Sequence, residues 1–564
     1  MKKTLNLALI MLVIILCLSL MAGCGTGAAS SPKASTAAPT ASAPGTEVPA
    51  TEPDPTPESD PEPEAVFPLA ESVTFSAFIE FPPPFAAFIE DWNDNYGWIQ
   101  MEKLTNVHID FMSVSTETVV QTYNVMAASG DYADIISGVG RRQSGGLAAA
   151  LEQEIIVDLT TLDKSLYPNL SAIFDANPEY YKKALTDDGK LGFFPQMYSQ
   201  DRTGWFGPCI RQDWLDALGL EAPVTYDDYH DVLTAFKTEY SPSDPLVLFR
   251  TGVSRYNYLL AGFGVAGDIS PDGTISGAFY NDNGTVKFGI MQDGFKEYLT
   301  LMNTWYNEGL ISQNFVSNES DNQNPPNEIL TTGNAGIWIG KSIVFPEWTN
   351  NASDENFHVM AITDAVKNAG DKNHLSADQS AWLGQTDGWS IGTTCEDIEL
   401  CCQYLDYFYS PEGHMAANYG IEGESYTLDD DGNAVYTELV TNNQDGISFG
   451  RGVGIFSIQG GGFMVDWTRE EQTYNDDQKA ARGVWTSVSD NANGISVTLN
   501  AAESEVVAQL WGDIGTYCSE NILKFITGSN NLDSDWDTFI AQLQNHKIDE
   551  VVAQYQSAYD RIYK

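Results

Sequence analysis

The fold is decided by the stretch that opens with Val73-Thr-Phe-Ser-Ala77 and closes with Val107-His-Ile-Asp-Phe111. In the first pentapeptide, apolar residues alternate with Thr74 and Ser76, which is the period of a strand with one buried face. The closing pentapeptide predicts a second strand, and Trp98 to Thr105 predicts a helix between them. A strand, a helix and a strand in this order predict a βαβ unit, and therefore an α/β fold.

The same alternation continues along the chain. Val119 to Met126 predicts a helix that Gly130 can end, and a strand is expected to follow at Ala133-Asp-Ile-Ile136. Thr225 and Asp228 have the spacing of a capping box, and Ser410-Pro411 has the pattern of a helix start.

The first residues predict export. Lys2 and Lys3 precede an apolar run over residues 5–20, and Met21-Ala-Gly-Cys24 follows. Charge, apolar run and small residues in this order are typical of a secretory signal. A cysteine directly after Ala-Gly resembles a bacterial lipoprotein signal, which implies that residues 1–23 are removed and Cys24 is lipidated. An uncleaved signal anchor is the alternative, because the run approaches spanning length.

Residues 24–66 predict a tether. They are mostly Ala, Ser, Thr, Pro and Glu, with almost no large apolar side chain before Val66-Phe67. Such a composition cannot bury enough apolar surface to offset the entropy of ordering, so we expect a disordered, lipid-anchored leash on the outer face of the membrane.

Composition excludes several classes of function. The net charge of −50, from 28 basic and 78 acidic residues, argues against binding to nucleic acid or to an anionic membrane surface. The sequence has no HExxH motif and no G-x-x-x-x-G-K-[ST] P-loop, and its six histidines have neither triad nor metal spacing. Five cysteines would remain beside the lipidated one, without CxxC spacing, and one or two disulfides are compatible with them. We therefore expect a protein that is not an enzyme and has no cofactor.

Several motifs, in order along the chain, resemble the extracellular solute-binding lipoproteins of ABC importers (family 1), in the group with the alginate- and oligosaccharide-binding lipoproteins. Each motif alone is weak, whereas their collinear succession is specific. They are Ala127-Ala-Ser-Gly-Asp-Tyr-Ala-Asp-Ile135, Leu185-Thr-Asp-Asp-Gly-Lys-Leu-Gly-Phe-Phe-Pro195, Ile210-Arg-Gln-Asp-Trp-Leu-Asp-Ala-Leu-Gly-Leu220, Asp387-Gly-Trp-Ser-Ile391, Tyr419-Gly-Ile-Glu-Gly-Glu-Ser-Tyr426 and Tyr555-Gln-Ser-Ala-Tyr-Asp-Arg-Ile-Tyr563.

The resemblance implies a type II periplasmic-binding-protein fold, with two discontinuous lobes joined by a hinge and a ligand cleft between them. We expect the N-terminal lobe to hold residues 67–195 and 376–426, and the C-terminal lobe residues 196–375 and 427–564. It also implies a monomer that captures a saccharide, in particular an oligosaccharide, by lobe closure and delivers it to importer permease subunits.

No metal site is predicted. Where the alginate-binding relatives carry a calcium loop, this chain has Lys237-Thr-Glu-Tyr-Ser-Pro-Ser-Asp-Pro245, which is short and poor in ligands. Loops at 268–279 and 427–438 each miss one key position of an EF-hand and are expected to be Asp-Gly turns.

Sugar sites pair flat aromatic rings with hydrogen-bonding side chains. Any Trp here could instead fill a core, because Trp is highly buried on average, and Arg211 could instead pair with Asp213. Gln196 and Ser342 stand where the alginate-binding relatives place aromatic contacts, which argues against alginate itself. The candidate ligand contacts are Asn95, Trp98, Trp205, Arg211, Trp389, Glu422, Tyr426 and Trp467.

Two other functions fit the same composition. An extracellular glycosidase would need two carboxylates across a cleft, about 5 to 10 Å apart. A surface sensor or adhesin could use the same two-lobed fold to bind without import.

Overall fold

The computed structural model describes residues 67–564, with interruptions. The predicted signal peptide, Cys24 and the tether all lie outside the described residues. The interruptions are at residues 83–84, 87, 117, 200–203, 250, 252–257, 269–275, 319–324, 326, 376–383, 386, 445–446, 448, 488, 491 and 496.

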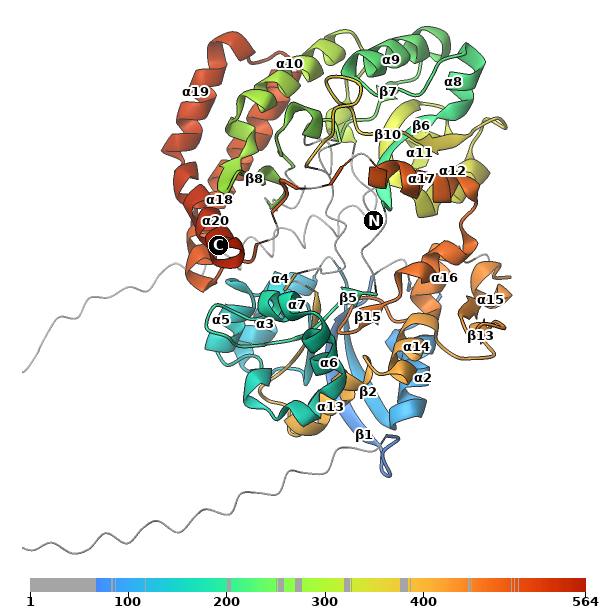
Figure 1. Cartoon of the computed structure of the whole chain (residues 1–564), viewed down its shortest axis with the longest axis vertical. Helices are drawn as coiled ribbons and strands as arrows, with labels where there is room; N and C mark the ends of the chain where they lie inside the picture. Colours follow the sequence, from blue (N-terminus) through green and yellow to red (C-terminus); the bar gives the residue numbers. More distant parts are fainter. Residues whose placement is uncertain are drawn as a thin grey trace, which may run out of the picture. The chain divides into compact units, whose positions relative to one another are not determined.

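The first sheet has five strands in the order β2-β1-β3-β12-β4. Figure 1 labels two of them, β1 and β2. β1 pairs in parallel with β2 and with β3, whereas β12 is antiparallel to β3 and to β4. The predicted βαβ unit is therefore confirmed, with α2 (Tyr96–Thr105) as its helix. The strands are β1 (Val73–Glu80), β2 (Val107–Val114), β3 (Ile135–Ser137), β4 (Phe194–Pro195) and β12 (Gly388–Ile391).

We call this sheet and the elements that share its buried apolar cluster the first lobe. Two short pairings extend it: β5 (Met197–Tyr198) with β15 (Met464–Val465), and β13 (Tyr426–Leu428) with β14 (Ala434–Tyr436). Its helices are α2, α3 (Val119–Ser129), α4 (Val139–Arg142), α5 (Gly146–Glu152), α6 (Pro168–Ala176), α7 (Pro178–Ala184), α13 (Ile398–Tyr407), α14 (Pro411–Tyr419), α15 (Glu438–Thr441) and α16 (Phe449–Phe456).

The second sheet has four strands in the order β11-β6-β10-β7. β6 is antiparallel to both β10 and β11, and β10 is parallel to β7. We call this sheet and the elements packed on its two buried clusters the second lobe. The strands are β6 (Phe206–Arg211), β7 (Asp244–Leu246), β10 (Ala335–Lys341) and β11 (Val359–Ala361), beside a hairpin of β8 (Phe279–Asp282) and β9 (Thr285–Phe288).

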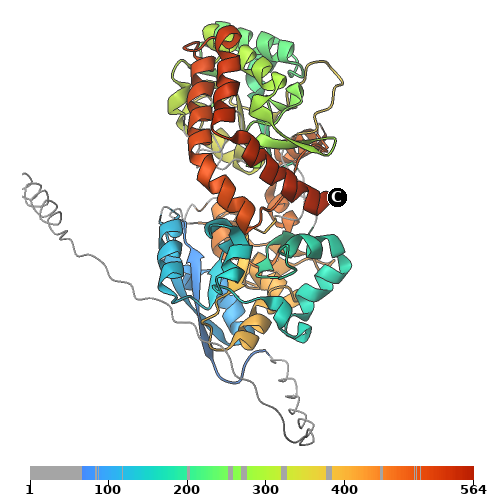
Figure 2. The same cartoon turned by 90° about the vertical axis from the view of Figure 1, so that its left-hand side faces the viewer.

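Helices of the second lobe come from both its early and its late segments. Figure 2 shows the red C-terminal helices side by side, in agreement with their mutual contacts. The helices are α8 (Gln212–Leu218), α9 (Tyr226–Tyr240), α10 (Asp293–Asn307), α11 (Asn327–Thr331), α12 (Phe345–Asn351), α17 (Asp476–Ser487), α18 (Ala501–Ile526), α19 (Leu532–Asn545) and α20 (Ile548–Tyr563).

The chain passes between the two lobes three times. The passages lie between Tyr198 and Phe206, between Leu375 and Gly388, and between Val465 and Ala481. The third is later than the boundary that we placed at Tyr426. Residues 427–465 belong to the first lobe, because their apolar side chains are buried in the same cluster as β1.

Local helix signals are formed as the sequence predicts. Both hydrogen bonds of the Thr225–Asp228 capping box are present at the start of α9. Ser410 caps α14, whose first residue is Pro411. Gly130 ends α3 in the left-handed conformation, which glycine adopts without strain. The cysteines of the described part are buried free thiols, and in that part no helix combines the length and the apolarity needed to cross a bilayer.

Candidate ligand-binding site

The carboxyl ends of the first sheet's parallel strands face the passages between the lobes. β1 ends at Glu80 and β3 at Ser137, and the chain leaves the sheet for the second lobe beyond the end of the parallel strand β4. β12 is antiparallel and begins at Gly388, so the chain returns from the second lobe at this same edge. In open α/β sheets, ligands bind outside the carboxyl ends of the strands.

The second sheet presents a matching edge. β6 begins at Phe206, directly after the first passage, and the antiparallel strand β10 ends beside it at Lys341. Trp205 lies at this edge and is half-buried. The Lys341 ammonium lies 5.2 Å from the centroid of the Trp205 ring. The second lobe therefore offers a partly exposed indole and a cation at the edge that the passages reach.

A chain of alternating charges occupies the edge of the first sheet. The Glu80 carboxylate accepts from Arg142 at 2.8 Å and from Arg141 at 3.2 Å. Arg141 also pairs with Asp387 at 3.1 Å. The side chain of Arg142 is 2% exposed, whereas that of Arg141 is 45% exposed. Burial and the neighbouring Arg141 lower the pKa of Arg142 to about 10, against the opposing effect of Glu80.

Glycines make room for this charge chain. A Cβ atom on Gly138 would overlap the guanidinium of Arg142, and one on Gly140 would overlap the Gln385 carbonyl oxygen. Gly138 also donates its N–H to the Gly388 carbonyl at 2.9 Å. The short helix α4 is therefore packed directly beneath the returning passage, which fixes the position of Arg141.

The third passage carries an aromatic cluster. Trp467 packs against Tyr198 with a centroid separation of 5.1 Å, and the Arg482 guanidinium lies 4.8 Å from the Trp467 ring. Arg482 also lies over Tyr474 and forms an ion pair with Glu471. Trp467 is 5% exposed, so its ring holds the passage together and shows little surface to a ligand in this structure.

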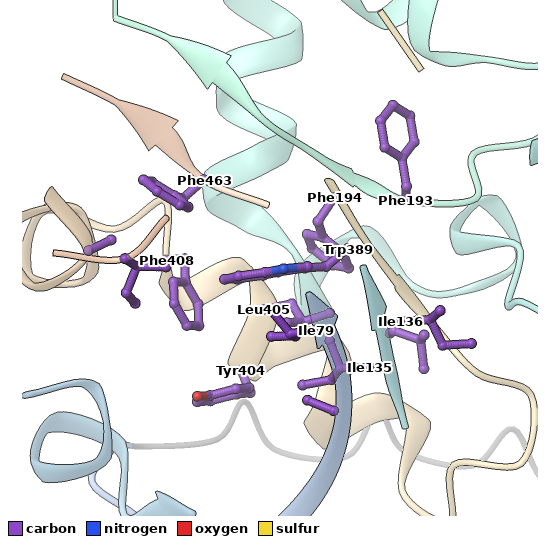
Figure 3. Packing of buried hydrophobic residues seen from close by; sticks show 14 of the residues in the cluster. Ile79, Ile135, Ile136, Phe193, Phe194, Trp389, Tyr404, Leu405, Phe408 and Phe463 are labelled. Atoms are coloured by element: carbon purple, nitrogen blue, oxygen red, sulfur yellow. The ribbon is translucent and has the colours of Figure 1, made fainter. Parts of the chain in front are cut away.

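Two of the predicted aromatic contacts lie in the core of the first lobe. Trp389 is fully buried and Trp98 is 6% exposed, and their rings are 5.5 Å apart. Figure 3 shows Trp389 enclosed by Phe408, Phe463 and Leu405. The Trp389 indole has no exposed surface and the Trp98 side chain has little, and both stabilise the core of the first lobe.

Asn95 and Arg211 are also fully buried, and their polar groups bind other residues of the protein. Asn95 caps α2 and donates to the carbonyls of Gly454 and Ser457 at 3.1 and 2.9 Å. Arg211 forms a two-point ion pair with Asp213 and a second ion pair with Asp354. The pairing with Asp213 that the sequence offered as an alternative is therefore present.

The last two predicted contacts follow α14. Tyr426 is 6% exposed and packs on Tyr419, with ring centroids 5.6 Å apart. Glu422 is exposed in the turn between α14 and β13. Of the predicted residues, Trp205 is thus the aromatic side chain that combines partial exposure with a place at an interlobe edge.

The candidate ligand contacts predicted from the sequence did not include Arg141 or Arg142. The available signal was position: the two arginines follow the predicted strand at Ala133-Asp-Ile-Ile136 in a glycine-rich turn, where a parallel strand reaches its carboxyl end. The burial of Arg142 depends on Glu80, which is far away in the sequence.

Within the described residues, no group of three His, Cys, Asp or Glu side chains is placed to hold a metal ion. The Asp429 carboxylate accepts from the backbone N–H groups of Asp431 and Asn433, so it closes its own turn. Residues 269–275 of the other EF-hand-like loop lie outside the described part.

Known proteins resemble this chain in sequence and in fold. The fructooligosaccharide ABC transporter substrate-binding protein FusA of Streptococcus pneumoniae is 24% identical over 527 residues, covering 88% of this chain and 91% of that protein. Its structure in complex with kestose matches with a TM-score of 0.69 and 21% identity, over 86% of this chain and 99% of that one. The alginate-binding protein AlgQ2, solved without calcium, matches with a TM-score of 0.68 and 22% identity, over 88% of this chain and 100% of that one.

These solved structures share the two-lobed fold described above. The family model of the bacterial extracellular solute-binding proteins matches residues 80–415, more than half of the sequence. This chain belongs to the bacterial extracellular solute-binding protein family.

Proposed function

We propose that this protein is an extracellular, lipid-anchored substrate-binding protein that captures a saccharide, in particular an oligosaccharide, for an ABC importer. The observation that carries the proposal is the chemistry at the two sheet edges that the passages between the lobes reach. One edge presents the exposed guanidinium of Arg141 between two carboxylates, and the other presents the half-buried indole of Trp205.

This combination suits a sugar. A pyranose or furanose ring has an apolar C–H face that can lie on the indole of Trp205, and hydroxyls at its rim that can accept from Arg141. Closure of the lobes would remove water from both contacts and strengthen the charge-assisted hydrogen bonds. FusA, which the sequence resembles, is named for fructooligosaccharide, and its structure holds kestose.

The carboxylates at the first edge favour a binding protein over a glycosidase. A glycosidase needs one carboxylic acid to donate a proton and one carboxylate to act as base or nucleophile. Glu80 and Asp387, the carboxylates at the first edge, are both ion-paired with Arg141. Both carboxylates are thus engaged as acceptors of charge-assisted hydrogen bonds from a guanidinium.

The N-terminal sequence supports the anchored part of the proposal. A lipidated Cys24 followed by a polar tether would hold a monomeric binding domain at the outer face of the membrane, within reach of permease subunits. The lobes would then capture and release the solute while the lipid keeps the protein near its importer.

Isothermal titration of the mature chain against a panel of oligosaccharides tests the proposal. We expect one or more sugars to bind with unchanged covalent structure, as mass spectrometry of the recovered sugar would show. Trp205→Ala should weaken binding roughly tenfold, because stacking is lost. Trp511→Ala, which removes a half-buried indole from α18, is the matched control. Failure of every sugar in the panel to bind would refute the proposal.

A further inference from the structure

The charge chain at the edge of the first lobe is balanced. It holds two guanidinium groups, Arg141 and Arg142, and two carboxylates, Glu80 and Asp387, in the order Arg142–Glu80–Arg141–Asp387. Arg142 is buried and also donates to the Ser137 carbonyl, so it has no free face for a ligand. Arg141 is therefore the one cation of this chain of four that a ligand can touch.

The surroundings of Arg141 disfavour an anion. Its two nitrogens already face carboxylates at 3.2 and 3.1 Å, and those carboxylates are themselves 21% and 34% exposed. A third carboxylate brought to the same guanidinium would meet two like charges within a few ångströms. The net charge of −50 adds a long-range repulsion against any polyanion that approaches the protein.

The same surroundings favour hydroxyl groups. The contacts to Glu80 and Asp387 use two of the five N–H groups of Arg141, and a hydroxyl oxygen can accept from another. The hydroxyl proton can at the same time be donated to the second carboxylate oxygen of Glu80, whose ion pairs both use Oε2. A hydroxyl is thus the group that can donate and accept at this position without adding charge.

Close packing of α4 against the returning passage places Arg141 beside Asp387. Gly138 and Gly140 leave no space for side chains next to the two arginines, and Gln385 anchors the passage by donating to the Lys183 carbonyl at 2.9 Å. Asp387, which completes the chain of charges, lies on that same passage. A ligand anion that reaches Arg141 therefore also lies beside the carboxylates of Glu80 and Asp387.

We infer that Arg141, held between Glu80 and Asp387, contacts the ligand and makes this protein selective for neutral saccharides over uronate-containing ones. The inference rests on the proposed function and adds to it the class of saccharide. The relatives include binding proteins named for each class of saccharide. FusA is named for fructooligosaccharide, which is neutral, and AlgQ2 for alginate, which is a polyuronate.

The test compares neutral oligosaccharides, including kestose, with oligogalacturonates and oligoalginates of matched length by isothermal titration at pH 7. We expect the best neutral sugar to bind and the acidic sugars to bind at least roughly tenfold more weakly. Arg141→Gln should weaken the neutral sugar roughly tenfold, and Arg141→Lys should restore the affinity only in part, since lysine lacks the planar fork. Lys103→Gln removes the same charge from the exposed end of α2 and should change nothing.

Asp387→Asn provides the decisive second variant. It removes one negative charge beside Arg141 and should raise affinity for the acidic sugars while leaving the fold intact, whereas Asp110→Asn on exposed β2 should not. Thermal melting of each variant separates lost contacts from lost folding. Two results would overturn the inference but not the proposed function. The first is an acidic sugar that binds the native protein as tightly as its neutral counterpart. The second is a folded Arg141→Gln variant whose affinity for the neutral sugar is unaltered. Failure of all sugars overturns the proposed function and the inference together.

Discussion

Arg561 in the last helix binds a carboxylate of each lobe with one guanidinium. It forms a two-point contact with Glu503 at 2.8 and 2.9 Å within the second lobe, and an ion pair with Asp187 of the first lobe. Asn500, which caps α18, donates to the same Asp187 carboxylate at 2.8 Å. Lys182 adds a hydrogen bond to the Ile562 carbonyl at 3.3 Å. The lobes are thus joined by polar contacts as well as by the three passages.

Asp187→Asn should loosen this contact between the lobes. Because both partners are partly exposed, the loss is expected to be about 0.5 to 1 kcal/mol, which shifts the lobe equilibrium a few-fold. Small-angle scattering of the ligand-free protein should show a larger or broader distribution of dimensions. Asp188→Asn is the matched control, since Asp188 pairs with Lys190 inside the first lobe. Identical scattering from both variants would contradict the prediction.

Asp364 should make stability fall as pH rises. Complete burial raises the pKa of this carboxyl to about 7, against a hydrogen bond from Asn373 that lowers it. A folded-state pKa above the unfolded value gives stability that is complete below about pH 4 and is lost as pH rises to about 7. The loss is about 1.4 kcal/mol per pH unit within this window.

Asp364→Asn removes this titration. Denaturant unfolding at pH 5, 6, 7 and 8 should show the variant gaining stability relative to the native protein as pH rises, with no further gain well above pH 7. Parallel stability curves for the two proteins would show that Asp364 is ionised throughout.

Gly461 should tolerate no side chain. A Cβ atom at this position would overlap the six-membered ring of Trp389, which is fully buried. We expect Gly461→Ala to lower the free energy of unfolding by about 1 to 3 kcal/mol through overpacking. Gly512→Ala in α18 is the contrasting variant, because open space surrounds that position. There alanine should stabilise the helix by up to about 1 kcal/mol.

Cys24→Ala tests the anchor. If lipidation of Cys24 anchors the protein, the variant should lack the mass of the lipid. Cells producing it should either release it into the medium or retain it through an uncleaved signal. Native protein should partition into detergent. Detergent partitioning by the variant after cleavage of the signal would rule out this cysteine as the anchor.

Local patterns predicted much of the fold because their causes are local. The alternation at Val73-Thr-Phe-Ser-Ala77 gave β1, and the capping box at Thr225 set the start of α9. The third passage could not be placed in this way. Residues 427–465 belong to the first lobe through distant packing, such as Phe456 against Tyr96 with centroids 4.7 Å apart.

The site was harder to predict than the fold for a related reason. A tryptophan in a glycine-rich stretch has the same sequence signature whether it stacks on a sugar or fills a core, and Trp389 lies in the core. What distinguishes Trp205 is its place at the start of β6, which depends on the pairing of β6 with β10. Arg141 follows the end of β3, a position that likewise depends on a distant pairing, that of β3 with β1.

The position of β12 between β3 and β4 has a consequence for how the protein matures. Gly388 to Ile391 must enter the middle of a sheet whose other strands end at Pro195, and β15, which closes the same core, arrives only at Val465. A chain that is synthesised from its N-terminus therefore cannot complete either half until most of it has been made. Long-range pairing of this kind is slow, and the self-repulsion of its dense negative charge opposes association of the incomplete chains.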